Sequence, residues 1–209
     1  MIAIIDYGIG NLGSVLNALK FLNFEAKVTS NKEEILAADK VILPGVGAFS
    51  DAMNSFIKQG FDEVIAKLIE KNTPILGICV GMQMLFEYSY EYGKHKGLNL
   101  LPGNVIKFDD SKYKVPHLGW NQINIIKDTP LLKGVDKSYV YFVHSYHLDS
   151  SKGYEIATSN YAGVEFPCAV NKGNLYGVQF HPEKSGDVGL KILKNFGEIN
   201  EDISSNWFT

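Results

Sequence analysis

The first 90 residues alternate short apolar runs with longer amphipathic runs. The apolar runs are IAIID at 2–6, EAKVTS at 25–30, KVILPG at 40–45 and PILGIC at 74–79. The amphipathic runs are SVLNALKFL at 14–22, EEILAA at 33–38, DAMNSFIKQ at 51–59, FDEVIAKLIEK at 61–71 and GMQMLFEYS at 81–89. Short strands that alternate with helices form βα units, and such units build a mainly parallel sheet. This alternation therefore predicts an α/β fold with a central sheet flanked by helices.

The pattern changes after about residue 104, where strand-like runs follow one another with no long helix between them. These runs are VIKF at 105–108, WNQINII at 120–126, YVYFVHSYHL at 139–148, YEIATSN at 154–160, PCAV at 167–170 and NLYGVQF at 174–180. Glycine, asparagine and aspartate separate them, so we expect antiparallel strands added to the sheet in the C-terminal half. A last amphipathic run at 187–199 predicts a C-terminal helix. No repeat, low-complexity tract or linker divides the chain, so residues 1–209 are expected to form one domain.

Composition and charge exclude several classes of function. The formal net charge is -3 and the sequence pI is about 6.0, which provides no basic surface for nucleic acid. No run of ~18 apolar residues predicts a membrane span, and the apolar N-terminal run meets Asp6 too early for a secretion signal. We therefore expect a cytoplasmic protein. Cys79 and Cys168 lack the Cys/His spacing of a metal site, so we expect free thiols, no metal and no cofactor.

Residues 8–13, GIGNLG, match the G-x-G-x-x-G pattern of dinucleotide-binding turns and follow a predicted strand. That pattern also needs an acidic residue at the end of the second strand, where this chain has TSN at 29–31. A tight turn from strand to helix explains the three glycines without a ligand. We therefore favour a simple turn over a nucleotide site.

The turn GICVG places Cys79 between two glycines, where a strand-like run becomes a helix-like one. This is the thiol form of the nucleophile elbow, in which a sharp turn lifts one side chain above the edge of the sheet. Gly77 and Gly81 remove side chains that would collide there. The helix behind Cys79 directs its amides at the sulfur, which favours the thiolate and offers the Val80 amide to a developing oxyanion. Cys168, in EFPCAV, has no such setting and fits a small buried thiol.

A thiol nucleophile needs a base, and the base needs a group that orients it. His181 ends the run LYGVQF and is followed by Pro182 and Glu183. The rigid proline separates two groups that an extended backbone places on the same side, so Glu183 can hold the imidazole while the ring faces the sulfur. The other histidines are expected to have different roles: His144 held in a strand by hydrogen bonds, and His95 and His147 exposed in polar stretches.

Together these motifs resemble those of the class I glutamine amidotransferases, which carry an elbow of the form G-x-C-x-G-x-Q and a downstream H-P-E. The corresponding segments here are GICVGMQ and VQFHPEKS. Further segments, DYGIGNL, LPGVGAF, GMQMLFE, PHLGWN and YFVHSYH, are similar to those of the glutaminase subunits of imidazole glycerol phosphate synthases. The resemblance covers nearly the whole chain and implies the single-domain fold of a class I amidotransferase.

The resemblance implies a Cys-His-Glu triad that hydrolyses glutamine. Cys79 would attack the carboxamide, His181 would protonate the departing ammonia and then activate water, and Glu183 would orient His181. Backbone amides at Val46 and Val80 would stabilise the oxyanion. The residues implied to line the glutamine pocket are Gly47, Gln83, Glu91 and Ser145.

The sequence itself supports some of these assignments. The turn PGVG at 44–47 directly follows the run KVIL, and the carboxyl ends of parallel strands meet at one sheet edge, so this turn is expected beside Cys79. Gln83 lies one helical turn beyond Cys79, which directs its amide toward the mouth of the site. For Glu91 the alignment with the family leaves Glu87 as a competitor for the same place in the pocket.

The chemistry implies a partner, because ammonia released into water is protonated and lost. In this family the partner is a (β/α)8 barrel synthase/cyclase subunit, so the resemblance implies a heterodimer that serves histidine biosynthesis. On family grounds the interface would include YGIGNL and PHLGWN, with Trp120 as a possible anchor.

Three alternatives remain open from the sequence. The first is a paralogue that supplies ammonia to amidino-sugar synthesis for surface polysaccharides, because EYGKHKGLNLLPG and INEDISSNWFT depart from the usual form. The second is a free-standing hydrolase of the same sheet architecture, such as a γ-glutamyl hydrolase or a cysteine peptidase, against which PHLGWN argues. The third is an idle binding subunit, against which the intact triad argues.

Overall fold

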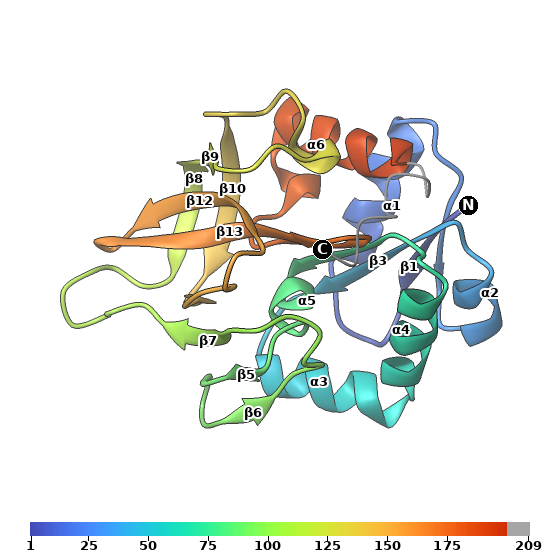
Figure 1. Ribbon diagram of the computed structural model, residues 1–209, viewed down its shortest axis with the longest axis horizontal. Coiled ribbons are helices and arrows are strands. Elements are labelled where there is room, and N and C mark those ends of the chain that lie inside the picture. Colours follow the sequence, from blue (N-terminus) through green and yellow to red (C-terminus); the bar gives the residue numbers. More distant parts are fainter. Residues whose placement is uncertain (200–209) are drawn as a thin grey trace.

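The computed structural model describes residues 1–199 and has a layered α/β architecture (Figure 1). Its centre is an eight-stranded sheet. In sheet order the strands are β2 (Ala26–Thr29), β1 (Ile2–Ile5), β3 (Lys40–Gly45), β4 (Ile75–Cys79), β14 (Leu175–Val178), β13 (Val164–Lys172), β12 (Glu155–Tyr161) and β9 (Asn124–Ile125). The strands from β2 to β14 run parallel, and β13, β12 and β9 continue the sheet in antiparallel pairs. The predicted α/β fold with a mainly parallel sheet is confirmed.

Helices cover both faces of the parallel half. In Figure 1, α1 (Leu12–Phe21) and α6 (Gly186–Glu198) lie on one side of the sheet, and α3 (Phe49–Lys58) and α4 (Phe61–Glu70) lie on the other. The short α2 (Lys32–Leu36) contacts α4, and the side chain of Asn31 caps it by accepting a hydrogen bond from the Glu34 amide at 3.0 Å. Because helices cover both faces, every residue of β1 and β4 is buried.

The sequence predicts that the strands of the C-terminal half join the central sheet, but only some of them do. β8 (His117–Gln122) pairs with β10 (Tyr139–His144) in a separate two-stranded sheet. A four-stranded sheet contains β11 (Tyr146–Leu148), β7 (Asn104–Lys107), β5 (Tyr88–Ser89) and β6 (His95–Lys96). The run at 139–148 reads as one strand in the sequence, but it breaks at Ser145, where the chain passes from one small sheet to the other.

The helix expected after the elbow is much shorter than its amphipathic run. α5 spans only Val80–Gln83, and the chain then continues in turns to β5. The carbonyl groups of Leu85 and Phe86 accept hydrogen bonds from amides of residues 99–101 instead of from the next helical turn. These tertiary hydrogen bonds replace helical ones, which ends the helix early.

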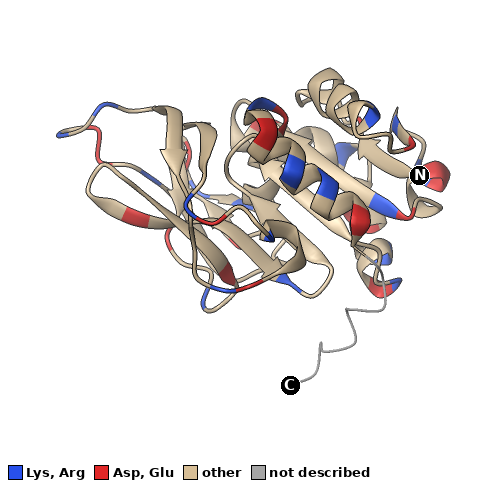
Figure 2. Ribbon diagram, turned by 90° about the horizontal axis from the view of Figure 1, so that it is seen from above, with Lys and Arg blue, Asp and Glu red and all other residues tan. Residues whose placement is uncertain are grey.

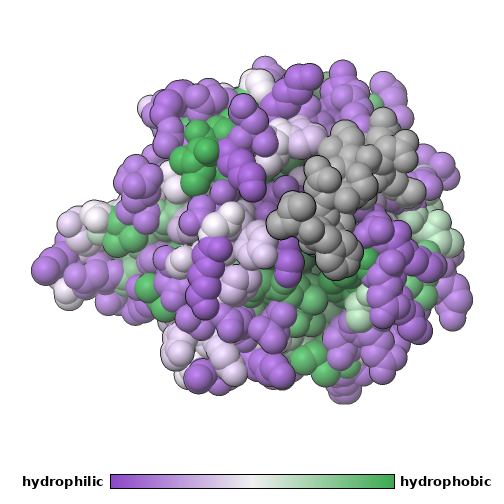
Figure 3. All heavy atoms as spheres, viewed as in Figure 1, coloured by the Kyte–Doolittle hydropathy of each residue, from purple (hydrophilic) through white to green (hydrophobic). Residues whose placement is uncertain are grey.

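The surface is polar and of mixed charge. Lys side chains, the only Lys or Arg residues in the sequence, are interspersed with Asp and Glu on the ribbon of the described residues (Figure 2), in keeping with the net charge of -3. The face seen in Figure 3 is mainly hydrophilic, with small apolar areas between polar ones. Within residues 1–199, no helix is long and apolar enough to cross a membrane.

Candidate active site

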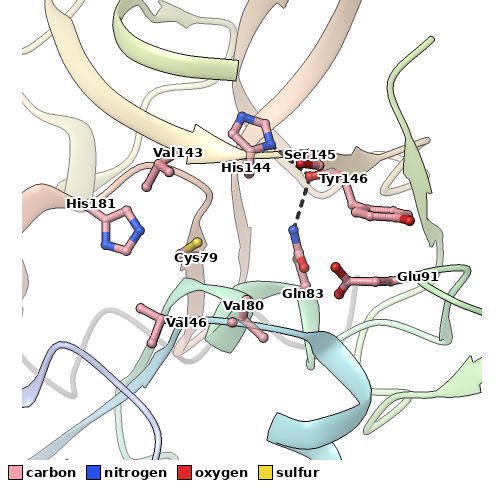
Figure 4. Close-up of a pocket in the computed structure, with 11 residues that line it drawn as sticks. Val46, Cys79, Val80, Gln83, Glu91, Val143, His144, Ser145, Tyr146 and His181 are labelled. Carbon is pink, nitrogen blue, oxygen red and sulfur yellow. Dashed lines mark hydrogen bonds between the residues drawn. The ribbon is translucent and has the colours of Figure 1, made fainter. Parts of the chain in front are cut away.

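A cavity of about 170 Å³ opens where the carboxyl ends of three neighbouring parallel strands meet (Figure 4). Val46 and Gly47 follow β3, Cys79 ends β4, and His181 follows β14. Gly45 pairs with Cys79 and Ile78 pairs with Val178, so the register brings these three ends level. The cavity is smaller than the roughly 300–1,000 Å³ typical of sites for drug-sized ligands, so it suits a small metabolite.

The residues predicted from the sequence come together here, with one exception. The cavity is lined by Val46, Gly47, Cys79, Val80, Gln83, Glu91, Val143, His144, Ser145, Tyr146 and His181. Glu183 is the exception, and it contacts the imidazole of His181 instead of lining the cavity.

The backbone at Cys79 makes the sharp turn that the glycine pattern predicts. Its φ of 55° and ψ of -114° are unusual for a residue with a side chain, and such strain is stored where surrounding contacts hold it. A Cβ on Gly77 would lie 2.8 Å from the Gly81 carbonyl oxygen, and a Cβ on Gly81 would overlap the Leu43 carbonyl oxygen. Both glycines are therefore needed for the close approach of β3, β4 and α5. Because α5 has a single turn, the helix dipole acts on the sulfur over less length than expected.

His181 and Glu183 form a buried pair. The Nδ1 atom of His181 lies 2.8 Å from Oε1 of Glu183, and both side chains are almost completely shielded from water. A carboxylate can only accept, so the proton lies on Nδ1 and the ring points its Nε2 side away from Glu183. Figure 4 shows the ring beside Cys79. The amide of Asn11 also donates to Oε1 of Glu183, at 3.1 Å, so a second hydrogen bond holds the carboxylate.

The surroundings keep His181 protonated at neutral pH. Burial by itself disfavours the imidazolium, but hydrogen bonds and charge interactions with Cys79 and Glu183 outweigh it and raise the pKa of His181 to about 10. An imidazolium beside a sulfur is arranged to stabilise a thiolate and to give a proton to a leaving group. Cys168 contrasts with this, because it is fully buried and burial alone raises the pKa of its thiol. Its interpretation as a small core thiol fits this geometry.

The structure separates the two glutamates that competed for the pocket. Glu91 lines the cavity, and its Oε2 accepts a hydrogen bond of 2.7 Å from the amide of Phe49 at the start of α3. Glu87 lies outside the cavity, and its Oε2 accepts from the amide of Gly103 at 2.8 Å. Glu91 is therefore the glutamate at the cavity. The residue that holds it, Phe49, lies shortly after the PGVG turn at 44–47.

Gln83 and Gln179 connect the cavity wall to the sulfur. Nε2 of Gln83 donates to the Tyr146 carbonyl at 3.2 Å and to Oε1 of Gln179 at 3.0 Å. Nε2 of Gln179 lies 3.7 Å from Sγ of Cys79. Gln179 is not among the site residues predicted from the sequence. The available signal was a glutamine in an otherwise apolar strand run, two residues before His181.

Two more histidines are buried and neutral. His144 accepts at Nε2 from Nδ1 of His117 at 3.0 Å and donates through its own Nδ1 to the Tyr146 carbonyl at 2.8 Å. Burial lowers the pKa of His117 to about 4 and that of His144 to about 3, so both stay uncharged. His144 is held in a strand as predicted. His147, expected to be exposed, is buried and stacks on Phe108, because the hydrophobic side of β11 faces the aromatic cluster.

The GIGNLG segment forms a turn that reaches the buried His181–Glu183 pair. Gly8 and Gly10 have φ values of 89° and 146°, which favour glycine, so the turn explains these two residues. Gly13 lies inside α1 with open space around it, so the turn does not explain the third glycine. Asn11 of this segment holds Glu183, as described above. Among residues 1–199, no group of three or more His, Cys, Asp or Glu side chains is placed to bind a metal.

Known proteins similar to this chain match nearly its whole length. The family model described as glutamine amidotransferase class-I matches residues 3–199. The imidazole glycerol phosphate synthase subunit HisH of Caldanaerobacter subterraneus subsp. tengcongensis is 54% identical over 201 residues, covering 95% of this chain and 98% of that protein. The subunit of the same name from Listeria innocua is 51% identical over 207 residues, covering 99% of each chain.

Solved structures share the fold at low sequence identity. A crystal structure of a glutamine amidotransferase has a TM-score of 0.74 at 18% identity and covers 95% of this chain and 100% of its own. The structure of PurLQS from Thermotoga maritima also has a TM-score of 0.74, at 21% identity, and covers 93% of this chain and 96% of its own. At these identities the likeness concerns the fold alone.

Proposed function

Because this chain belongs to the class I glutamine amidotransferases and, within them, to the family of the imidazole glycerol phosphate synthase HisH subunits, we propose that it hydrolyses glutamine to glutamate and ammonia for histidine biosynthesis in the cytoplasm. The observation that carries this proposal is the strained Cys79 turn beside the buried His181–Glu183 pair. The cavity in front of the sulfur has the small size that an amino acid needs.

The reaction proceeds through a thioester. The thiolate of Cys79 attacks the carboxamide carbon of glutamine and forms a tetrahedral oxyanion, which backbone amides at Val46 and Val80 stabilise. The oxyanion collapses as His181 protonates the departing nitrogen, and ammonia leaves. His181 then takes a proton from water, whose oxygen attacks the thioester carbon, and the sulfur leaves to give glutamate and the free enzyme. Glu183 keeps the His181 ring in the required tautomer.

The far end of the cavity holds the amino-acid part of glutamine. Glu91 lies across the cavity from His181 (Figure 4), and its carboxylate suits the α-ammonium group of the substrate. Both amino hydrogens of Gln83 are used within the protein, so its carbonyl oxygen is free to accept from the substrate. Gly47 and Ser145 also line the cavity and are available to contact the substrate.

The ammonia goes to a (β/α)8 barrel synthase/cyclase subunit, of the HisF type, that forms a heterodimer with this chain. The support is an exposed aromatic face on β8 and β10, where Leu118, Trp120 and Tyr139 are 58%, 55% and 56% exposed. Val143, which lines the cavity, pairs with Leu118 on this face. A partner docked there covers the mouth of the site, and aromatic residues are frequent anchors of interfaces.

A glutamate-release assay tests the proposal. The chain is assembled with the barrel subunit recovered by co-purification from the source organism, and glutamate is measured with glutamine as the sole substrate. We expect release that a glutamine-like electrophile abolishes by labelling Cys79. Release that persists after Cys79 is fully labelled would contradict the proposal.

Identification of the co-purified partner distinguishes the acceptor. A barrel synthase/cyclase supports histidine biosynthesis, whereas an enzyme of sugar amidation supports the paralogue. Of the two segments that favoured the paralogue, the second lies mostly in residues 200–209, outside the described residues. The identities of 54% and 51% to HisH subunits favour the histidine pathway.

A further inference from the structure

Gln179 is a buried polar residue that takes no part in the reaction steps proposed above. It follows β14, two residues before His181, and its side chain is completely shielded from water. Its two polar ends contact different residues: Oε1 lies 3.0 Å from Nε2 of Gln83, and Nε2 lies 3.7 Å from Sγ of Cys79. A buried amide needs partners for its hydrogen-bonding groups, and one of the two partners here is the reacting sulfur.

The direction of these hydrogen bonds follows from a group that can only accept. The Tyr146 carbonyl lies 3.2 Å from Nε2 of Gln83, so Gln83 must present its amino group there (Figure 4). The same amino group faces Oε1 of Gln179, and both of its hydrogens are then used. Gln179 must therefore turn its own amino group toward Cys79. The reversed orientation would bring two amino groups together and place a carbonyl oxygen against the sulfur.

The accepting carbonyl is itself fixed. Besides Gln83, it accepts a second hydrogen bond of 2.8 Å from Nδ1 of His144, so both of its lone pairs are occupied. His144 in turn accepts from His117 at 3.0 Å, and Nε2 of His117 lies 3.2 Å from Nδ2 of Asn121. Every side chain in this series has one allowed direction, and the series runs without interruption from β8 to the Tyr146 carbonyl.

We propose that Gln179 is a hydrogen-bond donor to the sulfur of Cys79 and stabilises its thiolate. A donor aimed at the charged form of a group favours that form. The amide is neutral, so it supports the thiolate without adding a second cation beside His181. The inference deepens the proposed function, on which its catalytic meaning rests, but donation to the sulfur is measurable without glutamine.

The test measures the rate at which iodoacetamide alkylates Cys79 as a function of pH, with peptide mapping to separate Cys79 from Cys168. Gln179→Met removes the donor and keeps a similar volume. A hydrogen bond to a charged group is typically worth enough to change the thiolate population about 10- to 100-fold. We therefore expect alkylation on the rising, low-pH part of the profile to slow by that factor and the profile to move up by about one to two pH units, with an unchanged plateau at high pH.

The matched control is Gln59→Met, because the amide of Gln59 donates to the Tyr7 carbonyl and to Ser55 and makes no contact with the cavity. Its alkylation profile is expected to equal that of the unchanged chain. If Gln179→Met loses glutamine turnover while its alkylation profile stays at the wild-type position, Gln179 is a packing residue and the inference is wrong.

A second measurement does not depend on the folding of a variant. In the unchanged chain, the side-chain amide protons of Gln179 are followed by NMR through the pH range in which Cys79 becomes reactive. Their chemical shifts are expected to change with the same midpoint as the alkylation rate. The chemical shifts of the Gln59 amide protons are expected not to change. If the chemical shifts of the Gln179 amide protons do not change as Cys79 ionises, the inference is wrong. Neither measurement contains glutamine, so failure of the proposed function alone leaves both expected results in place.

Discussion

At the residue scale, the two cysteines show how surroundings decide the chemistry of one functional group. Cys79 lies at a strained turn with an imidazolium and an amide directed at its sulfur. Cys168 lies in β13 and is completely buried, and burial raises the pKa of its thiol. One of the two thiols is therefore arranged for reaction, and the other is arranged for packing.

Replacement of each cysteine by alanine separates these roles. Cys79→Ala is expected to abolish glutamate release in the assembled complex, because no other thiol reaches the cavity. Cys168→Ala is expected to keep most of the activity and to lower the free energy of unfolding by roughly 1 kcal/mol, since it leaves a small void in the core. Urea denaturation and a glutamate-release assay check both. Stoichiometric labelling of Cys168 by a glutamine-like electrophile would reverse the assignment.

His181 and Glu183 are expected to differ in their contribution to turnover. His181→Ala removes the group that transfers protons, so we expect a loss of roughly three or more orders of magnitude in kcat. Glu183→Gln keeps the shape and removes only the charge that orients the ring, so the loss is expected to be smaller. Steady-state kinetics in the assembled complex measure both. Near-wild-type rates in the two variants would remove both residues from the mechanism.

At the element scale, the site depends on how closely three strand ends and one helical turn approach each other. Gly45, Gly77 and Gly81 lie where β3, β4 and α5 touch, and a Cβ on any of them would come within 3.0 Å of neighbouring backbone. The cavity therefore owes its shape to backbone packing as much as to the side chains that line it.

Gly81→Ala tests this packing, and Gly13→Ala is its control. The new Cβ at Gly81 overlaps the Leu43 carbonyl oxygen, and the chain must move to relieve it. We expect a loss of about 2 kcal/mol or more in the free energy of unfolding, together with lost activity. At Gly13, in α1, nothing lies within 4 Å of the added Cβ, so alanine is expected to be neutral or stabilising by up to about 1 kcal/mol. Equal effects of the two substitutions in urea denaturation would contradict the packing argument.

At the scale of the whole molecule, the cavity, the exposed β8–β10 face and the PGVG turn lie next to one another. The residues that line the cavity include Val46 and Gly47 of that turn and Val143 of β10. Gly47 has a φ of 78°, a conformation that glycine adopts without strain, so the peptide beside it has freedom to reorient. A partner docked on β8 and β10 is therefore near the group that is proposed to bind the oxyanion.

The isolated chain is expected to have almost no glutaminase activity. Low activity without the partner would prevent hydrolysis of glutamine whose ammonia cannot be used. The barrel subunit with its own ligand is expected to favour the orientation of the Val46 peptide in which its N–H faces the substrate. A thousandfold gain needs a preference of about 4 kcal/mol for the active arrangement. Glutamate release is measured for the chain alone, with the partner, and with the partner plus its nucleotide-derived ligand. High activity of the chain alone, unchanged by either addition, would support a free-standing hydrolase.

Much of this protein is readable from short stretches of its sequence. Strand and helix alternation in residues 1–90 predicts the parallel sheet, because hydrophobic periodicity is a local property. The elbow around Cys79 and the pair at His181 and Glu183 are also local, since each motif spans a few residues. One domain over residues 1–209 stays a prediction, because the family model covers residues 3–199 and the structure describes residues 1–199.

Tertiary structure decided the features that join distant segments. Gln179 donates to a sulfur 100 residues away in the chain and accepts from Gln83 across 96 residues, so its place in an apolar strand run does not by itself show that it belongs to the site. Glu91 and Glu87 are indistinguishable in the sequence, and only the approach of Phe49, 42 residues from Glu91, brings one of them to the cavity. The C-terminal strands likewise divide into separate sheets through pairing partners far along the chain. Hydrophobic periodicity and turn residues predict the conformation of a few neighbouring residues. Burial and hydrogen bonds between distant residues depend on how the whole chain folds, so they cannot be derived from short stretches of sequence.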